Sequence, residues 1–156
     1  MYGNWQELHQ QAILSLRQGN SDKAEVLWLQ ALNILTNENK SAEGMIVVLD
    51  GIFRLYVRTG HYAEAEKMVK KLIKVSEEHY GKKSASVAKS IADLGRLYLS
   101  TGKEEKAIEA YREALKIAES SHGSQHIETG RYHHSLGSHL LDVGEYKDGE
   151  FHLRKA

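Results

Sequence analysis

Residues 90–118 read SIADLGRLYLSTGKEEKAIEAYREALKIA, and two helical patterns meet there at Gly102. On both sides of this glycine, apolar and small residues recur at intervals of three and four residues, which is the spacing of one helix face. They are Ile91, Leu94, Gly95 and Tyr98 before it, and Ala107, Ile108, Tyr111, Ala114, Leu115 and Ala118 after it. Thr101 and Glu104 are spaced as a capping box, which predicts the start of the second helix. Because the connection is so short, we expect an antiparallel helix pair whose small residues allow close packing.

The same pattern recurs along the chain at a fixed period. Turn glycines occur at Gly19, Gly60, Gly102 and Gly144, at separations of 41, 42 and 42 residues. A small residue follows each turn glycine after five positions, namely Ala24, Ala65, Ala107 and Gly149. Self-similarity of this kind is typical of a solenoid of stacked hairpins. We therefore predict an all-α fold in one domain, residues 1–156, with repeats at approximately 4–40, 44–81, 86–123 and 127–156.

The residues of the third repeat resemble those of a known family. The arrangement L-G-x-x-Y, a turn glycine and then A-x-x-x-Y-x-x-A is similar to the tetratricopeptide repeat. The period is longer than the usual length of about 34 residues, and the additional residues fall in 79–88 and 121–130. This resembles the long-period subclass typified by kinesin light chains, whose inter-repeat loops carry a G-x-x-H-P element. Here His126 keeps the histidine and Ile127 replaces the proline. The resemblance implies a right-handed superhelical solenoid of about four antiparallel hairpins.

Composition narrows the classes of function. The formal net charge is zero, so no overall field would attract nucleic acid or a membrane surface. Cysteine is absent, which excludes disulfides, thiolate metal sites and a cysteine nucleophile. No apolar run is long enough to span a bilayer, and the first residues lack the apolar core of a signal peptide. We expect a cytoplasmic helical protein that interacts with neither nucleic acid nor membrane.

Histidine is the one residue type that suggests site chemistry. His122 and His126 have a spacing that could hold a metal on a helix, but no carboxylate completes a zinc pattern such as H-E-x-x-H. Ser135, His139 and Asp142 could be drawn as a catalytic set, but they lie on one predicted helix without an oxyanion element. We therefore expect no catalytic residues, no metal, no cofactor and no enzymatic activity.

The resemblance implies that the first helices of the hairpins line a concave groove. The groove positions then include Asp50, Arg54, Arg58, Lys89, Arg96, Leu99, Arg131, His134 and Ser138. Arg54 and Arg96 occupy one repeat position, and Lys89 and Arg131 another. Equivalent positions of stacked repeats project side by side, so we expect a ladder of cations along the groove. The alternative is that these are ordinary solvated charges, since long cationic side chains are common on helix surfaces.

The leading hypothesis is a non-enzymatic scaffold that binds a peptide segment or partner protein carrying acidic or carboxylate groups. One alternative is a self-associating array or a fragment of a longer solenoid. Another is a peptide-sensing regulatory domain of a transcription regulator. An apolar terminal face without a following repeat predicts a homo-oligomer through the C-terminal repeat. The residues expected on that face are Leu136, Leu140, Val143, Phe151 and Leu153.

Overall fold

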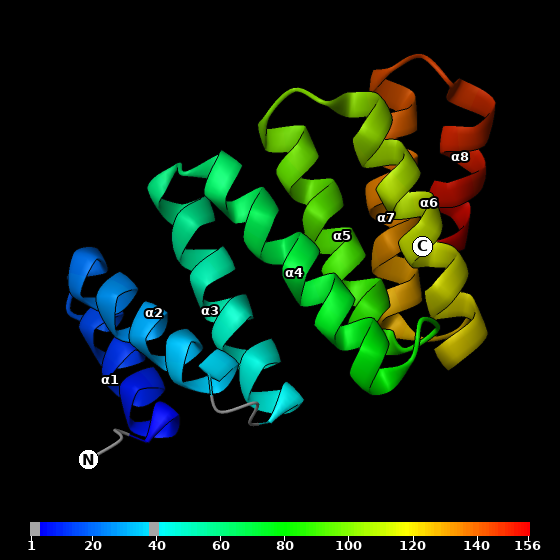
Figure 1. Cartoon of the computed structure of the whole chain (residues 1–156). Helices are drawn as coiled ribbons and strands as arrows, with labels where there is room; N and C mark the ends of the chain where they lie inside the picture. Colours follow the sequence, from blue (N-terminus) through cyan, green and yellow to red (C-terminus); the bar gives the residue numbers. More distant parts are fainter. Residues whose placement is uncertain (1–3, 38–40) are drawn as a thin grey trace. The chain divides into compact units, whose positions relative to one another are not determined.

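The computed structural model describes residues 4–37 and 41–156, which form eight α-helices and no strand (Figure 1). The helices are α1 (Trp5–Arg17), α2 (Ser21–Asn37), α3 (Ala42–Thr59), α4 (Tyr62–Tyr80), α5 (Ala85–Ser100), α6 (Glu104–His122), α7 (Ile127–Asp142) and α8 (Tyr146–Lys155). The predicted all-α class is confirmed. None of the described helices combines the length and the apolar character needed to cross a bilayer.

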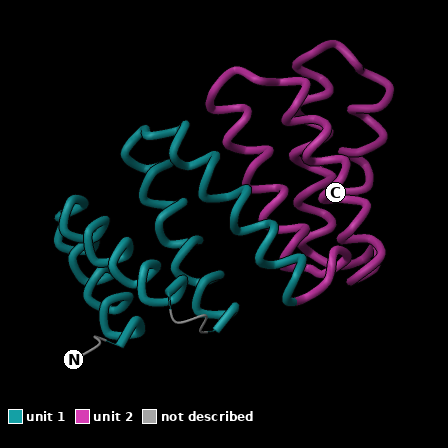
Figure 2. The backbone as a smooth tube through the Cα atoms, in the orientation of Figure 1, with its two compact units in different colours: residues 1–79 teal, residues 80–156 magenta. Residues whose placement is uncertain are grey.

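The chain divides into two compact units, residues 1–79 and 80–156 (Figure 2). In the first unit α2 packs against α1 and α3, and in the second unit α6 packs against α5 and α7. The last pair, α7 and α8, forms a further close contact. The organisation of residues 1–156 as a single domain, with the repeat boundaries given above, stays a prediction.

The turn glycines have the backbone conformation that only glycine adopts without strain. Gly60 has φ 78° and Gly102 has φ 71°, both in the left-handed region. Each ends the first helix of a hairpin, and the backbone N–H of Lys103 then donates to the carbonyl of Tyr98 at 2.8 Å. The fixed period of glycines in the sequence therefore marks the sites where the chain reverses.

The predicted capping box at Thr101 and Glu104 is wrong. The hydroxyl of Thr101 donates back to the carbonyls of Leu97 and Tyr98, each at 3.1 Å, so it completes the end of α5. Lys103 occupies the N-cap of α6 and makes no side-chain capping bond. A threonine hydroxyl can serve the carbonyls of a preceding turn as readily as the N–H groups of a following one.

In the second unit, α5 and α6 approach closely at small residues. A Cβ added to Gly95 would lie 3.3 Å from the Cβ of Ala110 and 3.4 Å from the carbonyl oxygen of Ala107. Ala107 and Ala114 are fully buried. The same device recurs in the last hairpin, where a Cβ on Gly137 would lie 2.9 Å from the carbonyl oxygen of Gly149. The predicted close packing at small residues is confirmed.

The expected open apolar face is partly wrong. Leu136 and Leu140 are fully buried, because α6 and α8 both pack against α7. Val143 and Phe151 are exposed, and Leu153 is partly exposed. Most of the apolar volume of the last hairpin is thus already covered within the chain.

In the first unit, the indole of Trp28 fills a space that a glycine leaves open. A Cβ on Gly51 would lie 2.7 Å from the buried Trp28 ring. The Trp28 Nε1–H donates to Nδ1 of His9 on α1 at 2.9 Å, so the ring is fixed by packing and by a hydrogen bond. Trp28 is therefore part of the core, and it links all three of the helices α1, α2 and α3.

Ala107→Leu should lower the free energy of unfolding by about 1–3 kcal/mol, because the larger side chain overpacks the crossing with Gly95. Glu109→Leu, on the exposed side of the same helix, should change stability little. Urea unfolding followed by circular dichroism measures both variants. Equal stability of the two would contradict the crossing described here.

Gly51→Ala gives a second test of packing, because packing and helix propensity predict opposite changes in the free energy of unfolding. Alanine in place of glycine ordinarily stabilises a helix interior by about 0.5–1 kcal/mol. Here the new methyl group meets the fixed Trp28 ring, so we expect a net destabilisation of about 1–2 kcal/mol. The loss should shrink when Trp28→Phe is introduced first, in a double-mutant cycle of unfolding free energies. An equal loss in both backgrounds would show that the two residues do not compete for space.

Candidate functional site

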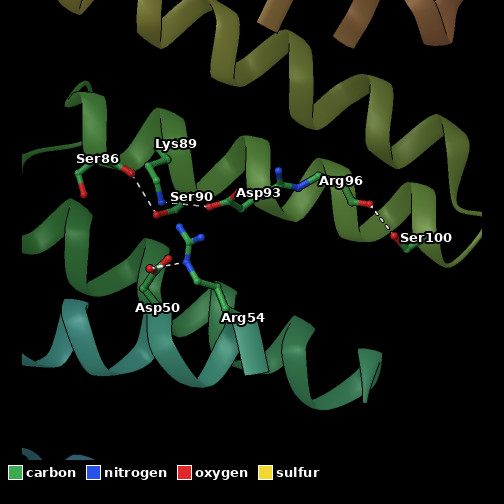
Figure 3. Close-up of polar contacts among 8 residues, drawn as sticks. All are labelled: Asp50, Arg54, Ser86, Lys89, Ser90, Asp93, Arg96 and Ser100. Carbon is green, nitrogen blue, oxygen red and sulfur yellow. Dashed lines mark hydrogen bonds and ion pairs between the residues drawn. The ribbon is translucent and has the colours of Figure 1, made fainter. Parts of the chain in front are cut away.

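A buried carboxylate organises the charged surface of α5. Asp93 is only 7% exposed, and it accepts hydrogen bonds from Lys89 Nζ at 3.3 Å and from Arg96 Nη2 (Figure 3). The two cations lie four residues before and three residues after it, which places all three side chains on one helix face. Lys89 and Arg96 keep 52% and 68% of their side chains exposed. Asp93 thus fixes two cationic side chains whose charged ends remain accessible.

Two of the other predicted cations, Arg131 and Arg54, are also paired with carboxylates of their own helices. On α7, Nη1 of Arg131 lies 2.9 Å from Oε1 of Glu128. On α3, Nε of Arg54 lies 2.8 Å from Oδ2 of Asp50. Pairs of this exposure contribute about 0.2–1 kcal/mol to stability at most. They reduce the positive potential that the sequence predicts for these positions, because each cation has a counter-charge within one helix turn.

The structure distributes the predicted groove residues between the two units. Asp50, Arg54 and Arg58 belong to residues 1–79, and the other six belong to residues 80–156. His134 and Arg58 are exposed, whereas Leu99 and Ser138 are partly exposed. Within the second unit, Lys89, Arg96 and Arg131 are accessible cations of two first helices, α5 and α7. The ladder that would join Arg54 to them stays a prediction.

Tyr132 is a member of this site that sequence reasoning missed. Burial raises its pKa to about 12, the negative charges of Glu128 and Asp93 raise it too, and Arg131 and Arg96 act in the opposite direction. Both carboxylates and both guanidinium groups therefore lie within electrostatic reach of one buried phenol. In the sequence Tyr132 has no tyrosine at the matching position of the other repeats, so periodicity gave no signal.

Tyr111 on α6 is buried beneath the same region and contacts side chains of α7. Burial raises the pKa of Tyr111, and a side-chain hydrogen bond with Ser135 of α7 lowers it in part. Its ring also stacks on His139 with centroids 6.0 Å apart. The sequence identified Tyr111 as a core residue, which is correct. It did not reveal that the hydroxyl group connects α6 to the polar side chains of α7.

The histidines His122, His126 and His139, which the sequence offers as site candidates, are engaged in local contacts. His122 and His126 stack with ring centroids 4.4 Å apart, and His126 Nδ1 accepts the N–H of Glu128 at the start of α7. His139 Nδ1 lies 3.6 Å from Oδ2 of Asp142. Across residues 4–37 and 41–156, no group of three or more histidine or carboxylate side chains is arranged to hold a metal ion.

Comparison with known families agrees with this architecture. The family model described as "Tetratricopeptide repeat" matches residues 54–120 and again residues 90–156, which together make up more than half of the chain. The chain belongs to the tetratricopeptide repeat family. No curated protein matches the sequence significantly.

Several solved structures resemble this one. BtubC (BKLC) from P. vanneervenii is 22% identical with a TM-score of 0.84, over 96% of this chain and 59% of that chain. A putative kinesin light chain from Podosopora anserina with nearly identical TPR-like repeats is 18% identical with a TM-score of 0.78, over 96% of this chain and 72% of that one. The chain therefore spans less than two thirds of the BtubC structure. These similarities establish the fold, a tetratricopeptide solenoid of the long-period, kinesin-light-chain-like kind.

A third similar structure is larger. It is the signal transduction ATPase with numerous domains PH0952 from Pyrococcus horikoshii, described as having a tetratricopeptide repeat sensor. It is 18% identical to this chain with a TM-score of 0.83, over 97% of this chain and 23% of that protein. The same helical array therefore also occurs as one part of a much longer chain.

The raised pKa of Tyr132 predicts a loss of stability in alkali. The unfolded phenol loses its proton near the ordinary pKa of about 10, whereas the folded phenol keeps it up to about pH 12. Stability from this group is therefore complete below about pH 10 and is lost as the pH rises toward 12. Tyr132→Phe should show a flatter decline in unfolding free energy over this range, measured by urea unfolding. Tyr146→Phe, at an exposed tyrosine of the same unit, should decline as the parent protein does.

Proposed function

We propose that this tetratricopeptide repeat protein is a non-enzymatic scaffold that binds an acidic peptide segment on the exposed face of α5 and α7. The observation that carries the proposal is the set of accessible cations Lys89, Arg96 and Arg131, each held in place by a carboxylate of its own helix. The first helices of the repeats supply all three. Side chains that are already ordered lose less conformational entropy when a ligand binds.

Internal pairing leaves these cations able to bind a ligand. A guanidinium group carries five N–H donors, and the bond from Arg96 to Asp93 uses Nη2. The remaining donors are available to a carboxylate from a partner, in a charge-assisted hydrogen bond. Asp93 is buried, so an approaching anion meets the cations before it meets this carboxylate. Among Lys89, Arg96, Arg131, Asp93 and Glu128 the cations are in excess by one charge.

Apolar positions beside the cations define the rest of the expected ligand. Leu99 lies three residues after Arg96 and is partly exposed, and Leu141 is partly exposed near the end of α7. The ligand we expect has Asp, Glu or a terminal carboxylate separated by apolar side chains. The tetratricopeptide repeat sensor of PH0952 supports an interaction role for an array of this kind.

Self-association through the last repeat is the second candidate. It is favoured by the exposure of Val143 at the end of α7 and of Tyr146 and Phe151 on α8. Sedimentation equilibrium separates the two candidates. A concentration-dependent dimer that is lost in Phe151→Lys would support self-association and not peptide binding.

The decisive variant for peptide binding is Arg96→Ala. An array of synthetic peptides with varied acidic and apolar spacing supplies the probe, and fluorescence anisotropy measures the Kd of the tightest peptide. Arg96→Ala should raise this Kd at least about tenfold, equivalent to about 1.4 kcal/mol, and reduce its salt dependence. Lys116→Ala removes an exposed cation from the second helix of the same hairpin and should have little effect. If Lys116→Ala is the more damaging change, the ligand binds the opposite face and the assignment is wrong.

A further inference from the structure

A buried histidine joins three helices in the second unit. His133 on α7 is only 3% exposed, and both of its ring nitrogens have partners on neighbouring helices. Its Nε2 lies 3.4 Å from Oε1 of Glu119 on α6, and its Nδ1 lies 2.9 Å from Nδ1 of His152 on α8. The contact between His133 and His152 is a direct polar connection between α7 and α8, and Glu119 extends it to α6. No part of the proposed peptide-binding face uses it.

The contact between the two Nδ1 atoms limits how many protons the pair can hold. When both rings are neutral, His133 donates its Nε2–H to Glu119 and accepts the Nδ1–H of His152. One added proton is also compatible, because His133 as an imidazolium donates to Glu119 and to the Nδ1 lone pair of His152. A second added proton puts an N–H on both Nδ1 atoms at 2.9 Å. That arrangement has two donors, no acceptor and two like charges in contact.

The groups around His152 agree with this limit. Burial lowers the pKa of His152, and the neighbouring His133 of α7 lowers it further. Asp148 of the same helix raises it, while Arg112 and Glu119 of α6 act in opposite directions, Arg112 lowering it and Glu119 raising it. The first of these effects exceeds the attraction of the carboxylates, so the fold resists placing a proton on His152.

We propose that the contact between His133 and His152 is a pH-sensitive latch, which holds α8 against α7 near neutral pH and releases it in acid. Released α8 would uncover the apolar side of α7 that carries Leu136 and Leu140, both fully buried when the latch is closed. The helix α8 is suited to such a release because it is only 10 residues long. The latch would add an acid-dependent change of surface to a scaffold that carries no net charge.

The direction of the effect follows from the protons bound in each state. The unfolded or released form of His152 has the ordinary histidine pKa of about 6.5, and the latched form has a lower one. The stability contributed by the latch is therefore complete above about pH 6.5 and is lost as the pH falls below it. Histidine is the side chain whose ordinary titration falls in this range.

Hydrogen exchange of the backbone amides of α8 tests the latch on the whole chain. Protection factors, which correct for the intrinsic effect of pH on exchange, should fall at least about tenfold for α8 between about pH 7.5 and pH 5. Those of the α5–α6 pair should change much less. His152→Gln can hydrogen-bond but cannot be protonated, so its α8 protection should be nearly independent of pH. His122→Gln, at an exposed histidine, should behave as the parent protein does.

Glu119→Gln adds a readout that a merely structural contact would not change. Loss of this negative charge lowers the pKa of His152 in the latched form still further below that of the released form, so the midpoint of α8 release should move to higher pH. An unchanged midpoint in Glu119→Gln, or an α8 in His152→Gln that opens in acid as the parent does, would overturn the proposal. If α8 of His152→Gln is unprotected even near pH 7.5, the midpoint shift in Glu119→Gln decides the question alone.

Discussion

Contact between helix backbones, without large side chains between them, is the constraint on which this structure depends. Gly95 lies against Ala107 and Ala110, and Gly137 lies against Gly149. Such contacts have little tolerance, because interiors are packed as densely as organic crystals and a single added methyl group must displace something. The aromatic rings are then placed around these contacts. Trp28 occupies the space above Gly51, where a bulky residue takes the room that a missing side chain leaves.

This packing also determines where polar groups are buried. Asp93 and Tyr132 lie on first helices of neighbouring hairpins, and close packing removes both from water. A buried carboxylate is costly unless it is hydrogen-bonded and paired, and Lys89 and Arg96 supply those partners from one turn away. The two cations are therefore held in place because the buried carboxylate of Asp93 requires hydrogen-bonded, oppositely charged partners. Their exposed ends are a consequence of satisfying a buried charge, and this fixes the direction in which they project.

Much of the fold could be predicted from the sequence, because glycine and small residues mark turns and crossings directly. The turn glycines have the left-handed conformation that their period indicates, and Ala107 is as buried as its position in the pattern requires. The capping-box pattern places Thr101 at the wrong helix end, because its hydroxyl can serve either of two adjacent helix ends. Leu136 and Leu140 were expected at an open face, since periodicity gives the apolar side of a helix but not what covers it.

The site was predicted less completely. The family resemblance implies that Lys89, Arg96 and Arg131 lie on first helices, and the structure shows these three side chains exposed on α5 and α7. Their pairing with Asp93 and Glu128 follows from intervals of three and four residues, which are visible in the sequence once the helices are fixed. Tyr132 and the connection between His133 and His152 could not be found in this way, because their partners are brought together by packing between helices that are distant along the chain.

The short range of these ion pairs has a consequence for how such arrays diversify. Arg54, Arg96 and Arg131 each pair with a carboxylate on the same helix. The net charge around each of these cations is therefore determined largely by residues within one helical turn. For these three cations, a hairpin can then be duplicated, exchanged or lost without removing the counter-charge of a cation in the hairpin beside it. Substituting one of these cations then changes the charge of its own repeat, while the helix crossings that hold the array together stay as they are.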